Sequence, residues 1–364
     1  MKSKLYAFVI LLAVIASATD SNAQGCVAVK NMSGCSLNWG EEQPVGWQFS
    51  VNYRYFRSYK HFVGSDEQEE RVENGTEVIN NDNSLNLGLT YAFNKRWSAT
   101  VIIPLLYIDR SSLYEHLGNS TATNPNQLRF HTQSQGLGDI RAIGYYNPMT
   151  EYKQGSLSLG LGFKAPTGKY DYTDEFHKPE GLVERVVDQS IQPGDGGLGV
   201  ITEFDFMHKV KGPYAVYATG LYLFNPRNTN GVKRSDNLTD GIPKSNEFSV
   251  PDQYMFRMGG RYISDHLQAS LGGRMECIPS KDLIGDSQGF RRPGYIISVE
   301  PSVFYSTGSH TFGINFPIAV ERNRTRSQID IERGINPNTG NPYHGDAAFA
   351  DWLLSLTYAY RLSK

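Results

Sequence analysis

Apolar and polar residues alternate with a period of two along most of this chain. From Val45 to Phe56, large apolar side chains occupy every second position, and mostly polar or small residues lie between them. The stretch from Trp352 to Leu362 repeats this alternation with leucine, tyrosine and tryptophan. Because successive side chains of a β-strand point to opposite faces, each stretch would have one apolar face and one largely polar face. The pattern therefore predicts β-strands.

Ten further segments carry the same alternation, so the sequence predicts about twelve strands in all. These segments are residues 85–93, 97–107, 137–146, 157–164, 198–206, 214–224, 253–262, 267–276, 295–303 and 312–321. Their lengths are near the roughly ten residues that a tilted strand needs to cross a bilayer. Turns of roughly two to nine residues alternate with polar loops of roughly fifteen to thirty, as in outer-membrane barrels. We therefore predict an all-β fold, a transmembrane antiparallel up-and-down β-barrel with short periplasmic turns and long extracellular loops.

Aromatic residues on the apolar faces gather at both ends of the predicted strands. Trp47, Trp97 and Tyr360 lie at strand ends beside short turns, whereas Tyr107 and Trp352 lie beside long loops. Amphipathic rings favour the interface between lipid and water. A large soluble β-sandwich, the alternative fold, would not need two such belts. The aromatic pattern therefore favours the barrel and predicts that it resides in the cell outer membrane.

The N-terminus has the pattern of a secretory signal peptide. Lys2 and Lys4 form a basic start, residues 5–16 form an apolar core, and residues 21–23 form a small-x-small cleavage site. The alternative, an anchoring helix, is disfavoured because spanning needs about twenty apolar residues. We therefore predict that residues 1–23 are a signal peptide.

The mature chain is predicted to begin with a short periplasmic segment, residues 24–43, followed by the barrel in residues 44–364. Cys26 and Cys35 are close in sequence, and an exported protein meets an oxidising compartment, so we expect them to form a disulfide. The segment either folds into the periplasmic mouth as a partial plug or remains a disordered leader. Cys277 falls on the apolar register of its strand, which predicts a small lipid-facing residue.

Charged residues occupy the polar register of the strands, which would face the barrel lumen. Such charges must be paired or hydrated, because stranding one would cost several kcal/mol. Two interpretations remain open: ion-pair ladders that brace a narrow lumen, or a water-filled path whose balanced charges give weak selectivity. The candidate lumen-lining residues are Arg54, Asp139, Arg141, Lys164, Glu203, Asp205, Arg257, Arg261, Arg274, Glu276, Glu300 and Glu321.

Composition and motifs argue against several other functions. The formal net charge is −2, which gives no electrostatic indication of a nucleic-acid partner. The eight histidines are scattered, mostly in predicted loops or at turns, so the sequence predicts no enzyme. It predicts no cofactor and no metal site either, because neither the ligand spacing of an EF-hand nor that of a zinc site occurs.

Three short motifs resemble those of a known group of proteins. They are QGLGDI at residues 135–140, GFKAPTG at residues 162–168 and QPG at residues 192–194. This part of the chain resembles the outer-membrane transporter family associated with the meta-cleavage pathway of phenol degradation. The resemblance implies a barrel that admits small, often hydrophobic or aromatic compounds. Gly136 and Gly138 would permit a tight bend, and Asp139 would form a hydrogen bond in the lumen.

Together these observations predict a channel or transporter for passive passage of small, hydrophobic or aromatic solutes. The alternative is a structural or surface-interaction barrel with a sealed lumen. The expected partners are outer-membrane lipid and lipopolysaccharide, the barrel-assembly machinery and a small-molecule solute. Arg322, Arg324 and Arg326 would either bind lipopolysaccharide or form a solvated rim.

Overall fold

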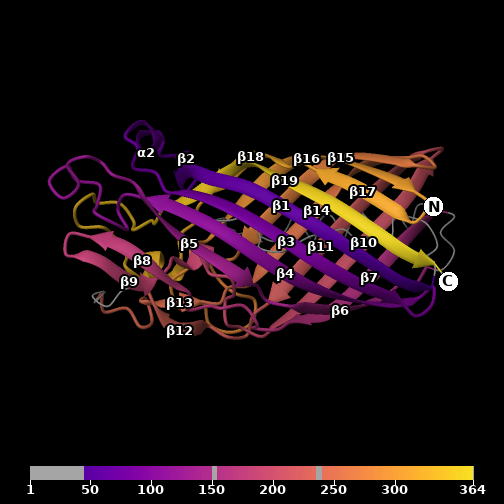
Figure 1. Ribbon diagram of the computed structural model, residues 1–364, viewed down its shortest axis with the longest axis horizontal. Helices are drawn as coiled ribbons and strands as arrows, with labels where there is room; N and C mark the ends of the chain where they lie inside the picture. Colours follow the sequence, from indigo (N-terminus) through magenta and orange to yellow (C-terminus); the bar gives the residue numbers. More distant parts are fainter. Residues whose placement is uncertain (1–44, 150–153, 235–239, 364) are drawn as a thin grey trace.

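The computed structural model describes residues 45–149, 154–234 and 240–363. It is a closed antiparallel β-barrel with tilted strands and with most of its loops gathered at one end (Figure 1). Among those residues, every helix is too short or too polar to span a lipid bilayer.

Twelve strands form the wall, two of them interrupted, so the predicted fold is confirmed. In sheet order from the first strand, the wall consists of β1 (Gly46–Val63), β3 (Ile79–Ala92), β4 (Trp97–Ser112), β5 (Phe130–Leu137) with β6 (Arg141–Tyr146), β7 (Gly155–Lys164), β10 (Gly199–Lys211), β11 (Tyr214–Phe224), β14 (Gln253–Ile263), β15 (Leu267–Ile278), β16 (Gly294–Thr307), β17 (His310–Asn315) with β18 (Ile318–Asn323), and β19 (Ala347–Ser363).

The barrel closes where the first wall strand meets the last. β1 and β19 pair antiparallel from Gly46 opposite Ser363 to Phe62 opposite Ala347. Asn52 reinforces this seam, because its amide donates to the hydroxyl of Ser355 at 2.8 Å. Closure gives the first and last wall strands a partner on both sides, which meets the condition for a β-structure to exist in hydrocarbon.

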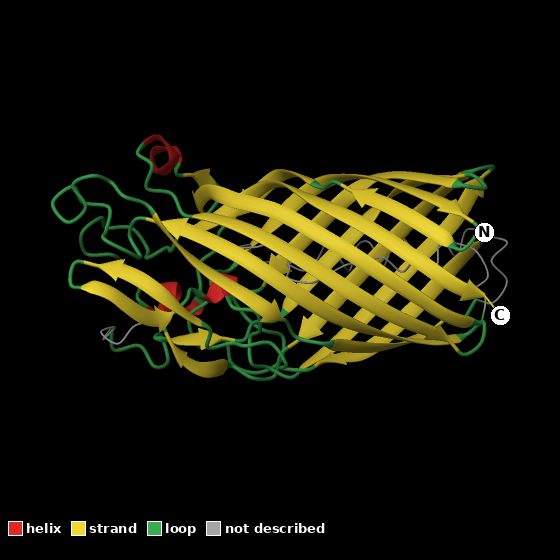
Figure 2. Ribbon diagram, viewed as in Figure 1, coloured by secondary structure: helices red, strands yellow, loops and turns green. Residues whose placement is uncertain are grey.

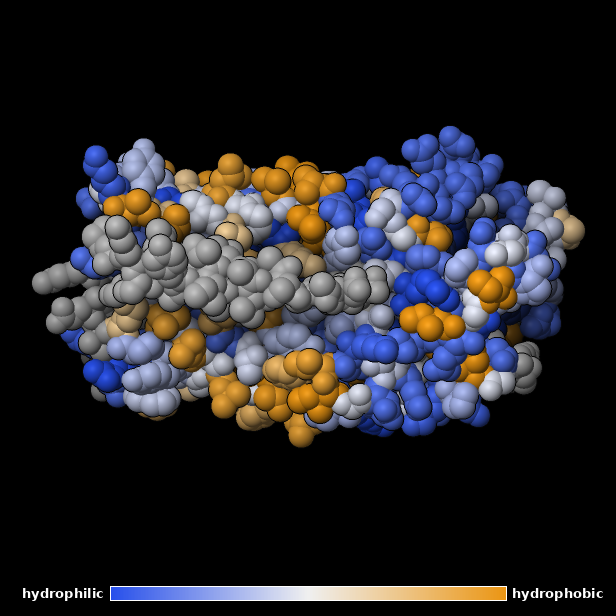
Figure 3. Space-filling model, turned by 180° about the vertical axis from the view of Figure 1, so that it is seen from behind, coloured by the Kyte–Doolittle hydropathy of each residue, from blue (hydrophilic) through white to orange (hydrophobic). Residues whose placement is uncertain are grey.

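The wall has an inverted distribution of side chains. Outward-facing leucines such as Leu161 and Leu271 are 65% and 61% exposed, whereas inward-facing polar residues such as Asn86 are buried. Apolar side chains gather over the barrel, and hydrophilic ones dominate its loop end (Figure 3). A closed barrel with an apolar outer surface matches a membrane environment, so the protein belongs in the outer membrane.

Aromatic rings mark both ends of the membrane-facing surface. At the short-turn end, Trp47 lies against Tyr91 with ring centres 4.6 Å apart, and Trp97 lies 4.7 Å from Tyr146. At the opposite end, Trp352 is 5.9 Å from Tyr55 and also stacks on another ring, that of Phe316. These contacts tie neighbouring strands together at the two interfaces.

The extracellular end contains small helices and strands in segments where the alternation predicts only loops (Figure 2). β1 itself is 18 residues long and continues well past the roughly ten residues needed to span the membrane. The small elements are β2 (Asp66–Glu67), α2 (Glu69–Glu73), β8 (Thr173–Lys178), β9 (Gly181–Val186), η1 (Gln189–Ile191), β12 (Thr229–Lys233), β13 (Glu247–Ser249) and α3 (Gln328–Glu332).

Predictions for the N-terminus lie outside the described residues. The signal peptide, the periplasmic segment at residues 24–43 and the disulfide between Cys26 and Cys35 therefore stay predictions. Cys277 is described, and its expected exposure to lipid is wrong. The residue is 1% exposed, because it lies directly between Tyr254 and Tyr295 on the neighbouring strands.

Candidate functional site

Eleven of the twelve charged candidates lie on the lumen side of the wall, and Glu321 does not. Glu321 is exposed, and its carboxylate accepts a hydrogen bond from the outward-facing Tyr295 hydroxyl. The cause is a register shift in β18, where the pairing moves from Ile297 opposite Glu321 to Ser298 opposite Ala319. One extra residue reverses the alternation, which a two-residue pattern cannot reveal.

Four of the lumen charges form a buried network across three adjacent strands. Glu300 of β16 pairs with Arg257 of β14 and, at 2.9 Å, with Arg274 of β15. Arg274 also binds Glu276 at 2.8 Å. All four side chains are at most 5% exposed, so each charge has a partner where water is scarce.

The lumen face also has an apolar region. Ile143, Ile201, Leu221, Leu223 and Met255 form one buried cluster across β6, β10, β11 and β14. In β6, β10 and β14 they share the inward register with charged residues of the same strand. The inner face of the wall therefore carries both charged and hydrophobic side chains.

The three short motifs at residues 135–140, 162–168 and 192–194 meet at one junction. The carboxylate of Asp139, in the gap between β5 and β6, accepts hydrogen bonds from the backbone N–H groups of Gly168 at 3.0 Å and Asp195 at 3.2 Å. Lys164 pairs with Asp195 and lies 3.7 Å from Asp139. A Cβ on Gly194 would lie 2.4 Å from the carbonyl oxygen of Gly168, so the two loops touch backbone to backbone. The motifs thus hold two loops against the wall.

Two cavities lie at the loop end of the barrel, and one of them is lined in part by this junction. The mouth cavity has a volume of about 440 Å³ and is formed by the extracellular loops and the ends of the longer strands. The inner cavity has a volume of about 100 Å³ and reaches Asp139, Arg141 and Lys164. Ser190, Arg291 and Arg292 line both cavities, which are therefore neighbours.

Arginines dominate the mouth cavity. Among the residues that the structure describes, only two carboxylates, Asp330 and Asp346, line it with them. The seven arginines of the lining are Arg71, Arg110, Arg234, Arg291, Arg292, Arg324 and Arg333.

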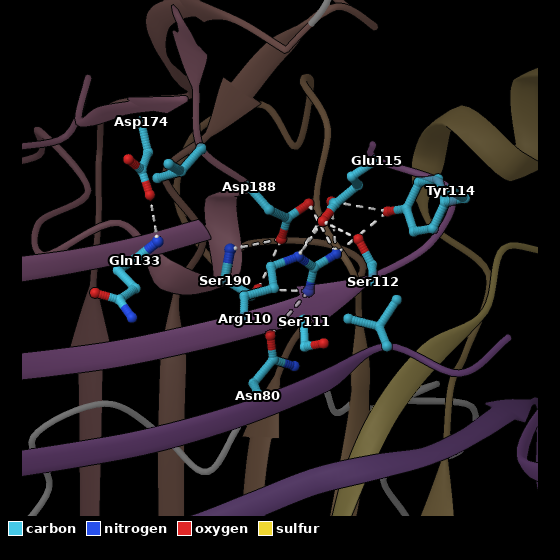
Figure 4. A network of polar contacts seen from close by, with 12 residues as sticks. Asn80, Arg110, Ser111, Ser112, Tyr114, Glu115, Gln133, Asp174, Asp188 and Ser190 are labelled. Carbon is cyan, nitrogen blue, oxygen red and sulfur yellow. Dashed lines mark hydrogen bonds and ion pairs between the residues drawn. The ribbon is translucent and has the colours of Figure 1, made fainter. Parts of the chain in front are cut away.

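Arg110, near the extracellular end of β4, is the centre of the best-connected part of this lining (Figure 4). Its guanidinium donates to Glu115 at 2.8 Å, to the Asn80 side chain at 2.9 Å and to the Tyr114 hydroxyl at 3.2 Å. It also lies 3.7 Å from the carboxylate of Asp188. The side chain is 4% exposed, so these partners hold it in one position.

Asp188 links Arg110 to Arg292. Arg292 donates one hydrogen bond to each carboxylate oxygen of Asp188, at 2.6 and 2.7 Å. Burial alone would raise the pKa of Asp188, but Arg110 and Arg292 outweigh burial and hold that pKa well below its usual value. The carboxylate is therefore charged and fixed at the side of the cavity.

The arginines at residues 322, 324 and 326 have partners within the protein. Arg322 pairs with Asp351, Arg324 lies 3.1 Å from Asp330, and Arg326 donates to backbone carbonyls. Arg324 is buried, so the expectation of a solvated rim is wrong for this residue. Among the described residues, no cluster of three or more histidine, cysteine or acidic side chains is placed to hold a metal ion.

Comparisons with known proteins identify the fold but no family. Neither the protein-family models nor the curated proteins searched include a match to this chain. An outer-membrane channel from Pseudomonas putida F1 has a TM-score of 0.57 at 14% identity, covering 88% of this chain and 97% of that one. The β domain of the Bordetella autotransporter Brka gives 0.44 at 13% identity, covering 87% and 100%. The Pseudomonas putida toluene transporter TodX gives 0.42 at 10% identity, covering 94% and 97%. The first likeness shows the barrel fold.

Proposed function

We propose that this protein is a channel for the passive passage of small solutes across the outer membrane. The observation that carries the proposal is the adjacency of the two cavities at Ser190, Arg291 and Arg292. Together they reach from the extracellular loops to Asp139 and Lys164 in the barrel wall. A solute captured outside would thereby be delivered to the lumen without crossing lipid.

Hydrophobic and aromatic compounds are the solutes that the lumen would accept best. Leu223 lines the inner cavity and belongs to the same apolar cluster as Ile143 and Met255. An apolar surface directly below the cavity favours ring-bearing or alkyl solutes over sugars. The motif resemblance to transporters associated with phenol degradation supports the same solute class.

A barrel with a sealed lumen, acting in structure or surface interaction, is the second candidate. The buried network of Arg257, Arg274, Glu276 and Glu300 favours it, since charges paired across three strands brace the wall and occupy lumen space. The two functions differ in one measurable quantity, the permeability of the purified protein.

Conductance in planar bilayers and solute uptake into liposomes test the proposal. We expect conductance from the unmodified protein and faster uptake of neutral aromatic solutes than of sugars. Ser190→Trp should reduce both, because residue 190 lies where the two cavities meet. Ser120→Trp, in an exposed extracellular loop, is the matched control and should leave both unchanged.

The opposite results would favour the sealed barrel. Absence of conductance together with absence of uptake by correctly folded protein would overturn the channel. If the two tryptophan variants behaved alike, the route through the two cavities would be wrong even where conductance is present.

A further inference from the structure

The mouth cavity carries more positive than negative charge on its surface. Several of its arginines are matched by acids: Arg71 pairs with Asp346, Arg324 with Asp330, and Arg291 binds Asp282 at 2.6 Å. Arg110 binds Glu115 and lies near Asp188, Arg292 binds Asp188, and Arg333 binds Asp240, so among the described residues Arg234 is the lining arginine without a carboxylate partner. A concave surface rich in guanidinium groups concentrates anions.

Arg234 is the arginine of this lining that lies most open to a ligand. It directly follows β12, and its guanidinium carbon lies 3.9 Å from the centre of the Phe290 ring. Arg292 lies over the same ring at 4.9 Å. Among the described residues, no carboxylate forms an ion pair with Arg234, and the residue is exposed. Two like charges therefore flank one aromatic ring.

The electrostatic surroundings of Arg234 favour an added negative charge. Partial burial and the neighbouring charge of Arg292 lower the pKa of Arg234. A bound anion would relieve this repulsion and would lie near two guanidinium groups that contact the same aromatic ring. Arg292 is held in place by its two hydrogen bonds to Asp188.

The rest of the lining suits a ligand that has a hydrocarbon part as well as a negative charge. Tyr114 and Phe290 contribute aromatic rings, and Val78 and Ile329 contribute aliphatic surface. A volume of about 440 Å³ lies within the range of cavities that bind small organic molecules. Inorganic phosphate would leave most of this apolar surface without contacts.

We propose that the mouth cavity is a binding site for a small organic carboxylate, held by Arg234 and Arg292 beside Phe290. The carboxylate would accept hydrogen bonds from the two guanidinium groups, and its hydrocarbon part would lie against the apolar lining. Capture of organic anions would then set the selectivity of transport, a step that rests on the proposed channel function.

Calorimetric titration of the purified full-length protein with benzoate tests the binding site. Benzamide, which is neutral and has almost the same shape, is the comparison ligand, and inorganic phosphate is the second. We expect benzoate to bind more tightly than either. Arg234→Gln should weaken benzoate binding about tenfold, as expected for loss of one charge-assisted contact. Arg57→Gln removes the same charge from an exposed position outside the cavity lining and should have no effect.

Three results would overturn this site: equal binding of benzoate and benzamide, tighter binding of phosphate than of benzoate, or equal effects of the two arginine substitutions. Liposome uptake of benzamide reports on the channel separately. Uptake of benzamide without selective benzoate binding would sustain the channel and refute the site. Selective benzoate binding that depends on Arg234, without uptake of either compound, would sustain the site and refute the channel.

Discussion

His116 is a buried imidazole in the extracellular loops, where single residues have large effects on local structure. Its Nδ1 accepts a hydrogen bond of 3.1 Å from the backbone N–H of His177, and its ring stacks on Phe176 at 5.3 Å. Nε2 is buried and has no hydrogen-bond partner among the described residues. Burial is the main cause that lowers the pKa of His116 to about 4. The folded protein therefore requires the neutral imidazole.

We predict that the extracellular loops lose stability as the pH falls from 6.5 towards 4. An imidazole whose pKa is lowered on folding contributes its full stability above the unfolded value and loses it as protons bind the unfolded chain. The loss approaches about 3 kcal/mol. Thermal unfolding in detergent at pH 7.5 and pH 4.5 would measure it, and His116→Phe should lose less stability over this interval.

The control for this prediction is His131→Phe. His131 is 53% exposed and already pairs with Asp109 at 2.9 Å, so its substitution should not reduce the pH dependence in the same way. Equal pH dependence of His116→Phe and the unmodified protein would show that another group is responsible. In the sequence, His116 is one of eight scattered histidines, and its burial against Phe176 and His177 arises only when the β8–β9 hairpin folds beside it.

At the scale of elements, the interruptions of the wall follow from proline and glycine. Pro317 separates β17 from β18, since proline has no N–H to continue the ladder. Pro104 of β4 lies opposite the gap between β5 and β6, where only the N–H of Gly138 donates to its carbonyl, at 2.9 Å. Both prolines were visible in the sequence. The alternation alone, however, predicted two unbroken strands.

The junction of the two glycine-containing loops yields a prediction at this scale. Gly194→Ala would place a methyl group against the backbone of Gly168 and should destabilise the fold by about 1 to 3 kcal/mol. The loss is expected as a lower melting temperature in detergent. Gly260→Ala is the control, because a Cβ at residue 260 would have no atom within 4 Å. Equal melting temperatures for the two variants would refute the close contact of the loops.

Strand positions could be predicted because a wall surrounded by hydrocarbon requires apolar and polar side chains to alternate along each strand. The mouth cavity could not, since its arginines are contributed by wall-strand ends and loops far apart in the sequence. Arg292 and Asp188, for example, are 104 positions apart. The alternation of side chains alone placed eleven of the charged candidates correctly on the lumen side. The prediction for Glu321 was wrong because a bulge in β18 reverses the alternation.

At the scale of the whole molecule, the inverted distribution of side chains predicts where a charge is tolerated. Leu271→Arg, near the middle of β15 and 61% exposed, should destabilise the barrel in lipid by about 2 to 4 kcal/mol. Leu182→Arg is the matched control, since Leu182 is 56% exposed in the β8–β9 hairpin, outside the wall. Unfolding free energies in bilayers would compare them. A similar cost at both positions would contradict the assigned membrane boundary.

The seam between β1 and β19 also constrains how the molecule is made. Asn52 and Ser355 are joined across it although 303 positions separate them, so this ladder forms only when nearly the entire polypeptide has been delivered. Until that moment, an assembly intermediate exposes the unpaired backbone edges of its terminal strands, which can pair with strands from other molecules. Any helper that shields these edges acts at one defined place, and a peptide copying β19 should compete there and stall maturation.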